Sequence, residues 1–370
     1  MTKVSVVLVG CGCPLRSMGW YHAMQLLDAG RIQNASLTYV VEPWYFAPAA
    51  EGTPGHSDFH EWAKKTKESH GVEFFHTVEE VPTAPAADDG SVRLAIISAR
   101  TADNPKLLDQ CLKLGCKAIY LEKPGAPTVS ELEAMKSRAD EAGVKVFMGF
   151  NKNVSSYLTF SRELVNKTAE KCDVTFLHNN NYANTEAELA ECFERNAEGM
   201  LKNMAIHELA ILVTYYGVTV DTIDKVEADK EFSSCKTLKG PASGKDFTDF
   251  DKLKFKIVTK SGVEVNVAAD RCGGDDSVGI VNKADSGEEL ARFTMPDEAT
   301  VANTDALKAK YGDAMPYFFA QDPDYLKLKQ LVVQNCIDGT PAEGVADIET
   351  AVETLKVAEY LTPILTKQLQ

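Results

Sequence analysis

Three glycines near the start of the chain have the spacing of a phosphate-binding turn. An apolar segment runs directly into Gly10 and Gly12, and Gly19 follows at the start of a helical pattern. Two glycines separated by one residue allow a tight turn and a close approach of a pyrophosphate, and a third lets the next helix pack closely. Six residues separate Gly12 from Gly19, where the G-x-G-x-x-G pattern has two, so this turn is enlarged. It predicts a dinucleotide site that includes Cys13 and Arg16, although glycine turns after strands are also common.

Glu42 lies where a nucleotide ribose would bind. It ends a second apolar segment at residues 37–41, and a carboxylate at this position hydrogen-bonds the adenosine ribose hydroxyls. Its charge repels a 2′-phosphate, which favours NAD, whereas Arg16 in the enlarged turn leaves NADP possible. The alternative is a solvated glutamate at a strand end. Residues 43–55 read as a loop whose aromatic side chains either flank an adenine or simply pack.

Strands and helices alternate through the first part of the chain. This alternation predicts an α/β fold with an N-terminal Rossmann-type, doubly wound parallel sheet in residues 1–150. The strands are expected at residues 4–9, 37–41, 94–98, 118–121 and 144–150, and the helices at 20–29, 106–114 and 129–142.

The pattern changes from about residue 151. Strands joined by tight turns, such as the one at Ser261 and Gly262, predict a C-terminal α+β domain with a large, mostly antiparallel sheet over residues 151–345. A last helix at 347–361 has one apolar stripe and is expected to stop before Pro363. The strands are expected at 174–178, 225–228, 252–259 and 263–268, and loops at 233–251 and 272–276.

Composition excludes several classes of protein. The 370 residues carry a formal net charge of −15, which argues against nucleic-acid binding. No apolar run approaches the roughly 20 residues that a membrane-spanning helix needs, and the N-terminus does not have the pattern of a signal peptide. Nine cysteines without paired spacings indicate reduced thiols in a cytoplasmic protein. His56 and His60 have no third ligand nearby, so we expect a helix start there and no metal.

Two motifs farther along the chain are more specific. Glu122, Lys123 and Pro124 follow a predicted strand, and Asn203 and His207 stand four residues apart at the start of an apolar helix. With the glycine turn, these motifs resemble the glucose–fructose oxidoreductase / inositol dehydrogenase (Gfo/Idh/MocA) family over nearly the whole chain. The resemblance implies an NAD(P)-dependent dehydrogenase in which the nicotinamide carries the hydride.

The resemblance also implies catalytic roles for Lys123, His207 and Asn203. A lysine at the carboxyl end of a parallel strand lies in the crevice where such sheets bind ligands, and its ammonium can donate to a substrate oxygen. A histidine on a helix can accept the hydroxyl proton while hydride leaves the same carbon. Residues 203 and 207 are expected to share one helical face. The alternatives are an exposed lysine before a turn proline and a helix histidine whose hydrogen bonds are satisfied within the protein.

Three positions depart from the family pattern. Asn203 stands where the family commonly has aspartate, Asn153 where it often has arginine, and Asn104 where it often has histidine. An asparagine cannot act as a general base, but it can orient a substrate by hydrogen bonds. These changes indicate a divergent branch with an altered substrate, or a protein that binds cofactor and turns over poorly.

Further binding residues follow from the family segments and from residue type. Tyr182 ends a stretch of amides, imidazole and phenol, which are groups that bind sugar hydroxyls or simply form a strand exit. The expected cofactor residues also include Ser98, Arg100, Asn104, Glu122 and Lys123. The expected substrate residues are Lys123, Asn151, Lys152, Tyr182, Arg195, Asn203 and His207.

These observations together predict hydride transfer between NAD, or NADP, and a secondary alcohol or ketone of a sugar, sugar derivative or cyclic polyol. The resemblance implies a homodimer or homotetramer, and a C-terminal helix at 346–370 that packs back on the first domain. Two alternatives stay open: an NAD-using glycosidase, and a non-catalytic, cofactor-sensing binding protein of the same fold.

Overall fold

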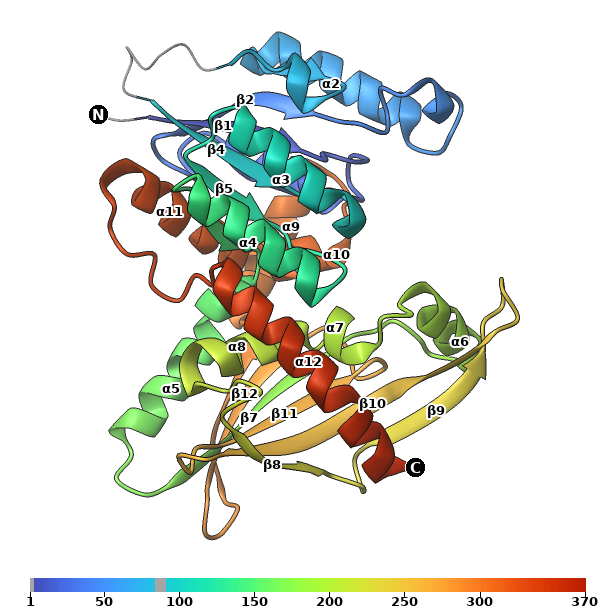
Figure 1. Ribbon diagram of the computed structural model, residues 1–370, viewed down its shortest axis with the longest axis vertical. Coiled ribbons are helices and arrows are strands. Elements are labelled where there is room, and N and C mark those ends of the chain that lie inside the picture. Colours follow the sequence, from blue (N-terminus) through green and yellow to red (C-terminus); the bar gives the residue numbers. More distant parts are fainter. Residues whose placement is uncertain (1–2, 84–90) are drawn as a thin grey trace. The chain divides into compact units, whose positions relative to one another are not determined.

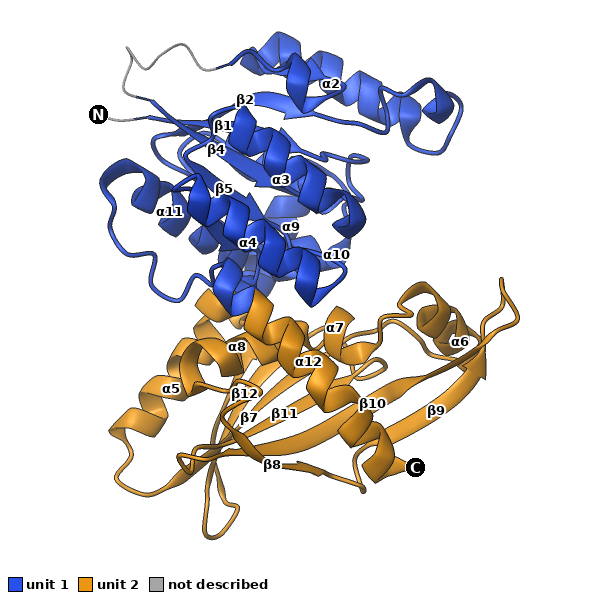
Figure 2. Ribbon diagram, viewed as in Figure 1, with its two compact units in different colours: residues 1–151, 300–351 blue, residues 152–299, 352–370 orange. Residues whose placement is uncertain are grey.

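The computed structural model describes residues 3–83 and 91–370. The chain forms two compact units, and each is discontinuous in sequence (Figure 2). The first unit comprises Met1–Asn151 and Thr300–Ala351, and the second comprises Lys152–Ala299 and Val352–Gln370. The first unit's N-terminal segment ends next to the predicted boundary at residue 150, and residues 300–345, predicted with the second domain, lie in the first unit.

The first unit is built on a six-stranded sheet whose neighbouring strands all run parallel. Its order is β3-β2-β1-β4-β5-β6, so the strand order reverses between β1 and β4. The strands are β1 (Val4–Val9), β2 (Ala35–Val41), β3 (Glu73–Phe75), β4 (Val92–Ile97), β5 (Ala118–Leu121) and β6 (Lys145–Met148). Their valine- and isoleucine-rich runs are buried, as expected for a sheet covered on both faces. The predicted doubly wound parallel sheet is confirmed.

Helices cover both faces of this sheet. In Figure 1, α3 and α4 lie over one face, while α11 lies on the other. The helix α4 begins where predicted, because Thr128 Oγ1 accepts a hydrogen bond from the Glu131 amide at 3.2 Å. The helices of residues 1–151 are α1 (Met18–Leu27), α2 (His56–His70), α3 (Asn104–Lys113) and α4 (Val129–Glu141), with short 3-10 turns η1 (Pro48–Ala50), η2 (Val78–Glu80), η3 (Thr101–Asp103) and η4 (Asn151–Val154).

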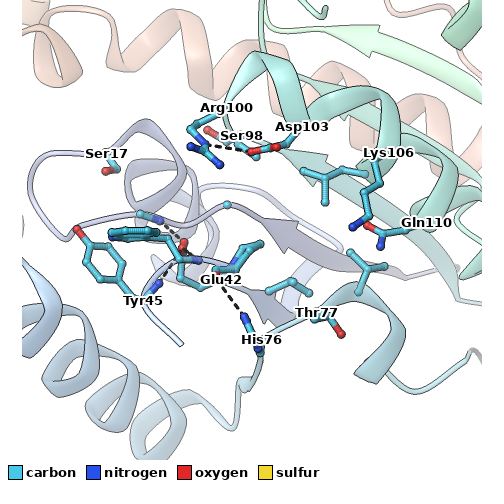
Figure 3. A pocket seen from close by; sticks show the side chains of 18 of the residues that line it. Ser17, Glu42, Tyr45, His76, Thr77, Ser98, Arg100, Asp103, Lys106 and Gln110 are labelled. Carbon is cyan, nitrogen blue, oxygen red and sulfur yellow. Dashed lines mark hydrogen bonds and ion pairs between the residues drawn. The ribbon is translucent and has the colours of Figure 1, made fainter. Parts of the chain in front are cut away.

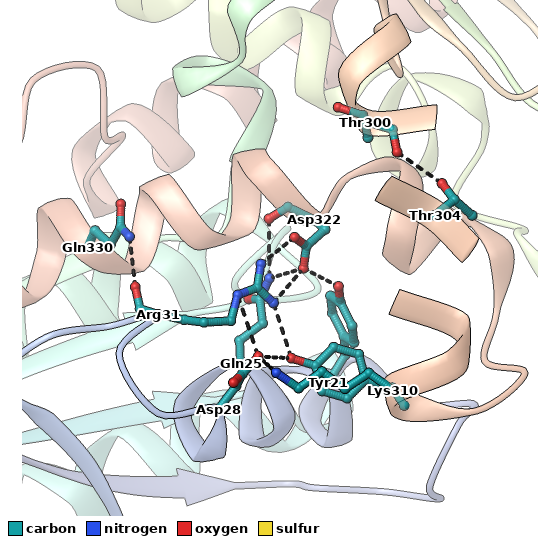
Figure 4. Close-up of polar contacts among 10 residues, drawn as sticks. Tyr21, Gln25, Asp28, Arg31, Thr300, Thr304, Lys310, Asp322 and Gln330 are labelled. Atoms are coloured by element: carbon teal, nitrogen blue, oxygen red, sulfur yellow. Dashed lines mark hydrogen bonds and ion pairs between the residues drawn. The ribbon is translucent and has the colours of Figure 1, made fainter. Parts of the chain in front are cut away.

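Residues 300–351, called the brace below, pack against α1 of the first unit (Figure 4). This segment contains most of α9 (Glu298–Tyr311), all of α10 (Pro316–Ala320) and α11 (Asp322–Asp338). The carboxylate of Asp322 accepts hydrogen bonds from Tyr21 and Arg31, and the ring of Tyr21 stacks on Phe318 at 4.9 Å. In the same segment, the backbone amide of Met315 donates a hydrogen bond of 3.0 Å to the carbonyl of Leu15, in the glycine turn.

The second unit is built on a seven-stranded sheet in the order β13-β12-β7-β11-β10-β8, with β9 pairing to β10. All pairs are antiparallel except β7 with β11. The mostly antiparallel sheet is therefore confirmed. Its strands are β7 (Cys172–Asn179), β8 (Ile223–Ala228), β9 (Ser234–Lys239), β10 (Asp246–Thr259), β11 (Glu264–Asp270), β12 (Ser277–Lys283) and β13 (Glu289–Met295). The predicted loop at 233–251 is wrong, since it forms the hairpin of β9 and β10.

The helices of the second unit are α5 (Ser156–Lys167), α6 (Glu186–Arg195), α7 (Met200–Asn203), α8 (Ile206–Tyr216) and α12 (Ile348–Leu369). The first four residues of α12 belong to the first unit. Four of these helices share one hydrophobic core with the sheet, whereas α6 packs in a smaller, separate cluster with Leu238 and Phe247.

The last helix continues through Pro363, contrary to prediction. The proline is exposed, while Leu361 and Leu365 on either side of it are buried. These leucines pack in the core of the second unit, to which residues 352–370 belong. The expected packing of this helix on the first domain stays a prediction.

Within the described parts of the chain, no helix combines the length and the apolar character needed to cross a bilayer.

Candidate functional site

A cavity of about 710 Å³ opens at the carboxyl ends of β1, β2 and β4 in the first unit (Figure 3). It lies where the strand order reverses, which is the place at which open parallel sheets bind ligands. Its volume is within the range of pockets that hold small molecules and cofactors. Six of the predicted cofactor residues line it: Gly10, Gly12, Cys13, Glu42, Ser98 and Arg100.

The glycine turn brings its backbone close to neighbouring chain. Gly10 and Gly12 have φ angles of +82° and +72°, which side chains rarely allow. A Cβ at Gly10 would lie 2.7 Å from the Cα of Ala99, so the turns after β1 and β4 touch. A Cβ at Gly19 would lie 2.0 Å from the carbonyl oxygen of Gly10, so α1 packs against the turn as the third glycine of a dinucleotide motif requires.

The extra residues of the glycine turn form a closed loop of their own. The Ser17 amide donates to the carbonyl of Cys13 at 3.0 Å, and the Cys13 amide donates to Ser17 Oγ at 2.9 Å. The helix α1 begins only after this loop, at Met18. The insertion therefore leaves Gly10, Gly12 and Gly19 in their expected places and adds Ser17 to the lining of the cavity.

Glu42 is buried beside the glycine turn, as the sequence predicts. Its Oε2 accepts a hydrogen bond from the Gly12 amide at 2.6 Å, and its Oε1 accepts one from the Trp44 amide at 3.0 Å. The Tyr45 amide also donates to Oε1, at 3.4 Å, so three backbone amides hold the carboxylate at the edge of the cavity. Oε2 has a second lone pair, which can still accept a hydrogen bond from a ribose hydroxyl.

The loop after Glu42 contributes aromatic side chains in two different ways. Trp44 and Tyr45 both line the cavity. Trp44 has half of its surface exposed, whereas Tyr45 is buried and its ring stacks on Phe59 at 5.2 Å. His76, which follows the edge strand β3, and Lys106, on α3, also line the cavity. No local sequence pattern marks either residue as part of a site.

The remaining predicted cofactor residues lie away from the cavity lining. Arg16 lies in the inserted loop, and the amide of Asn104 is buried, where it donates to the Gly125 carbonyl at 2.9 Å. Glu122 is held by the His22 ring at 2.9 Å and the Tyr120 hydroxyl at 3.0 Å. Lys123 follows directly and is partly exposed.

Glu122 ends a buried chain of polar groups that sequence reasoning missed. The amine of Lys329, on α11, lies 2.8 Å from His22 Nδ1, and His22 Nε2 lies 2.9 Å from Glu122 Oε1. Lys329 is 2% exposed and His22 is fully buried. Lysine is rarely buried unless it is paired, and nothing in the local sequence of α11 distinguishes this lysine from an exposed one.

The second unit contains a buried cluster of charged residues around Glu208. Its carboxylate lies 2.8 Å from Lys152 Nζ and 3.1 Å from His178 Nδ1, and the ring of His178 lies 6.3 Å from that of His207. Burial alone raises the pKa of Glu208, but Lys152 and His178 outweigh it and hold the pKa well below its ordinary value. The structure therefore brings together Lys152 and His207, which the sequence predicts, with Glu208, which it does not.

Asn203 and His207 do not share one helix. Asn203 ends α7, and His207 lies in the first turn of α8, with Met204 and Ala205 between the two helices. The side-chain amide of Asn203 donates to Glu198 Oε1 at 2.9 Å. The expectation of a single helical face, based on spacing alone, is therefore wrong.

The other predicted substrate residues differ in their surroundings. Arg195 is exposed, with an ion pair of 3.6 Å to Glu191 one helical turn away, and Tyr182 is 41% exposed. Asn151 is buried in the first unit, where its amide donates to Gln321 at 3.1 Å. In the residues that the structure describes, no three histidine, cysteine, aspartate or glutamate side chains gather as metal ligands.

Comparison with solved structures shows that the whole fold is shared with known dehydrogenases. A probable dehydrogenase from Thermotoga maritima is 18% identical, with a TM-score of 0.67 over 99% of this chain and 96% of that chain. A myo-inositol dehydrogenase from Corynebacterium glutamicum is 17% identical, with a TM-score of 0.68 over 99% and 97%. A scyllo-inositol dehydrogenase from Lactobacillus casei, with bound NAD(H) and scyllo-inositol, is 14% identical, with a TM-score of 0.67 over 99% and 98%.

Sequence comparison is more limited in extent. No curated protein matches the chain. A model of the Gfo/Idh/MocA family, described as an oxidoreductase family with an NAD-binding Rossmann fold, matches residues 56–150. This range begins after the enlarged glycine turn and includes the Glu122-Lys123-Pro124 motif. This match confirms the resemblance seen in the sequence and supports the oxidoreductase class and the NAD cofactor: residues 56–150 are similar to the NAD-binding Rossmann domain of the Gfo/Idh/MocA oxidoreductase family.

Proposed function

We propose that this protein is an NAD-dependent dehydrogenase that acts on a secondary alcohol of a cyclic polyol or sugar. The observation that carries the proposal is the cavity beside the glycine turn, where three backbone amides hold the Glu42 carboxylate. The side-chain-free turn at Gly10 and Gly12 suits a pyrophosphate, and the carboxylate suits ribose hydroxyls. The same charge disfavours a 2′-phosphate, so we expect NAD to bind more tightly than NADP.

When bound, the nicotinamide ring supplies hydride transfer. In this proposal, Lys123 donates a hydrogen bond from its ammonium to the substrate oxygen and so stabilises negative charge on it. His207 takes the hydroxyl proton during oxidation and returns it during reduction. Asn203 and Arg195 orient the substrate, because an amide and a guanidinium can hydrogen-bond hydroxyls but do not serve as bases here.

The buried cluster in the second unit supports a polar, hydroxyl-rich substrate. Glu208 fixes the imidazole of His178 and the ammonium of Lys152 near His207, so several hydrogen-bonding groups lie close together in this unit. Hydroxyl-rich substrates require such convergent polar groups. The solved inositol dehydrogenases of the same fold make cyclic polyols the first class to examine.

Two successive measurements test this proposal. A fluorescence titration should detect NADH binding, and NADPH should bind more weakly. A panel of inositols, sugars and sugar acids with NAD should then give net NADH formation with at least one compound. Tight NADH binding without turnover on the whole panel would contradict the dehydrogenase, and release of a sugar without net NADH would indicate glycosidase chemistry.

The proposal includes self-association through the second unit. The family resemblance supports a homodimer or homotetramer, and sedimentation equilibrium measures the mass directly. A single species of 40.4 kDa at micromolar concentration would contradict it.

A further inference from the structure

The cofactor cavity extends past Glu42 into a part that the glycine turn does not line. In the view of Figure 3, Glu42 lies between Ser17 and Tyr45 on one side and Thr77 and Gln110 on the other. The first side is the glycine turn, which suits a pyrophosphate, and Glu42 suits the ribose that follows it. The other side is the part left for the base of a dinucleotide. We call this part the base slot, and its lining residues are Thr77, Val78, Lys106, Leu107 and Gln110.

Two segments form the apolar walls of the base slot. Val78 begins η2, Leu107 lies in α3, and both side chains are buried. The amides of His76 and Thr77 both donate to Glu80 Oε2, at 2.9 and 3.4 Å, which fixes the chain as it enters η2. Apolar walls suit the faces of a planar base and leave its selection to polar groups at the edge.

Gln110 supplies a side-chain amide whose orientation is set by a neighbour. It lies on α3, one turn after Lys106 and Leu107, and its Nε2 donates to Glu79 Oε1 at 2.5 Å. A carboxylate can only accept hydrogen bonds, so it selects the NH2 side of the amide and excludes the flipped orientation. The carbonyl oxygen of Gln110 therefore points away from Glu79, and it is the acceptor that this side chain keeps for a ligand.

Glu79 is ionised, which makes this orientation permanent at neutral pH. Its own backbone amide lowers the pKa of Glu79 by more than partial burial raises it, and Gln110 and Lys106 lower that pKa further. A glutamine at position 79 would lift the restriction, because an amide can accept from Gln110 or donate to it.

A fixed acceptor at the edge of the slot distinguishes purines by the group at carbon 6. Adenine has an amine there, which donates, whereas guanine and hypoxanthine have an oxygen, which accepts. Two acceptors that face each other repel and leave both without a hydrogen bond. Sites built to pair with one polar group reject an analogue that lacks it. The Gln110 carbonyl should therefore favour adenine.

We propose that Gln110 is a specificity-determining residue that accepts a hydrogen bond from the 6-amino group of the cofactor's adenine, and that Glu79 is a positioning residue that fixes the Gln110 amide. The inference rests on the proposed function in taking a nicotinamide dinucleotide as the ligand. It adds a selection of the base, which depends neither on the substrate nor on hydride transfer.

Fluorescence titration with NADH and with reduced nicotinamide hypoxanthine dinucleotide tests this selection. The two cofactors differ in the group at carbon 6 of the base, and both carry the fluorescent reduced nicotinamide. The wild-type protein should bind NADH about tenfold more tightly. Gln110→Met removes the acceptor, so the affinity for NADH should fall about five- to tenfold and the two cofactors should bind almost equally.

Glu79→Gln separates the orientation of Gln110 from its packing. In this variant the Gln110 amide can turn its NH2 group toward the oxygen of hypoxanthine, so the affinity for the hypoxanthine cofactor should rise about fivefold. The affinity for NADH should change little. A residue with a purely structural role would not raise affinity for any ligand when it is replaced. Gln33→Met and Glu73→Gln, at exposed positions of the first unit, are the matched controls and should leave the ratio of affinities unchanged.

The inference is overturned if the wild-type protein binds both cofactors equally, or if a folded Gln110→Met keeps the tenfold ratio. A Glu79→Gln variant that keeps this ratio would remove the positioning role of Glu79. Discrimination between the cofactors without turnover on the polyol panel would refute the dehydrogenase and retain the selection of adenine. No binding of either cofactor would refute both.

Discussion

The candidate site of the first unit is formed mainly by main chain, and that of the second unit by side chains. The first unit uses main chain: a glycine turn, the ends of parallel strands and a carboxylate held by the amides of Gly12 and Trp44. The second unit uses side chains: Lys152, His178 and Glu208 are far apart in sequence and pair inside the protein. A backbone site depends on local conformation, whereas a side-chain cluster depends on the whole unit being folded around it.

This difference determines how each site should respond to mutation. Removing one side chain from a backbone site leaves the other donors in position, so the loss should appear mainly in ligand affinity. Removing one partner from a buried charge cluster leaves an uncompensated charge inside the protein, so the loss should appear in stability as well.

The largest effect is expected at the two residues proposed to carry the chemistry, one in each unit. Lys123→Ala and His207→Ala should each lower kcat by about two to four decades, a typical span for a group that handles a proton or polarises an oxygen. Steady-state kinetics on the substrate found in the panel measure this, with Lys327→Ala as a surface control. NADH affinity should change little, and a variant that keeps its full rate would remove that residue from the mechanism.

Glu208→Gln tests how much the buried charge cluster of the second unit contributes to the free energy of unfolding. The substitution leaves Lys152 buried without its carboxylate, so the free energy of unfolding at pH 7 should fall by about 3–5 kcal/mol. Urea unfolding measures it, and Glu191→Gln, at an exposed ion pair, is the matched control with a change below about 1 kcal/mol.

The same variant should also change how stability depends on pH. Because the folded pKa of Glu208 lies below its ordinary value of 4.5, its contribution is complete above that pH and is lost as the pH falls further. The difference between wild type and Glu208→Gln should therefore shrink below about pH 4.5. A difference that stays constant on acidification would mean that the carboxylate is not charged in the folded protein.

Glu42→Gln should have a smaller effect, and on affinity. It keeps the shape of the side chain but replaces one acceptor oxygen by a donor, which weakens hydrogen bonds from ribose hydroxyls. We expect the Kd for NADH to rise by about tenfold, with little change in the Kd for NADPH. Fluorescence titration with both cofactors measures the ratio, and an unchanged NADH affinity would show that Glu42 only braces the turn.

The smallest effect on stability is expected at Arg195, an exposed charged residue of the second unit. Arg195→Ala removes a solvent-exposed ion pair, so the free energy of unfolding should change by less than about 1 kcal/mol. Comparing the thermal unfolding of Arg195→Ala with that of Glu208→Gln would show whether burial determines how much a charged side chain of this unit contributes to stability. A loss comparable to that of Glu208→Gln would contradict this interpretation.

The cofactor region was predictable because its signals are local. A buried valine-rich run, a glycine turn and an acidic residue at the end of the next strand are each visible within a few residues, and the structure places them around one cavity. The enlarged turn did not hide the pattern, since its extra residues close on themselves between Cys13 and Ser17.

Long-range features were not predictable in the same way. Glu208 and Lys329 look like ordinary charged residues of amphipathic helices, and only the tertiary fold shows that they are buried. The strand at 234–239 is rich in polar residues and has no apolar alternation, so its pairing with β10 gave no signal. The spacing of Asn203 and His207 suggested one helix, but the break between α7 and α8 is a property of the packed unit.

The brace that joins Leu15 to Met315 bears on how the chain becomes a working protein. Nearly the whole polypeptide must leave the ribosome before the nucleotide turn meets its supporting segment. Until then, Tyr21 lacks the ring of Phe318, and Arg31 lacks the carboxylate of Asp322. A fragment ending at residue 151 would hold every strand of the parallel sheet, but the aromatic surface around Tyr21 would be exposed to solvent. We therefore expect a chain truncated before residues 300–351 to aggregate and not to bind a dinucleotide.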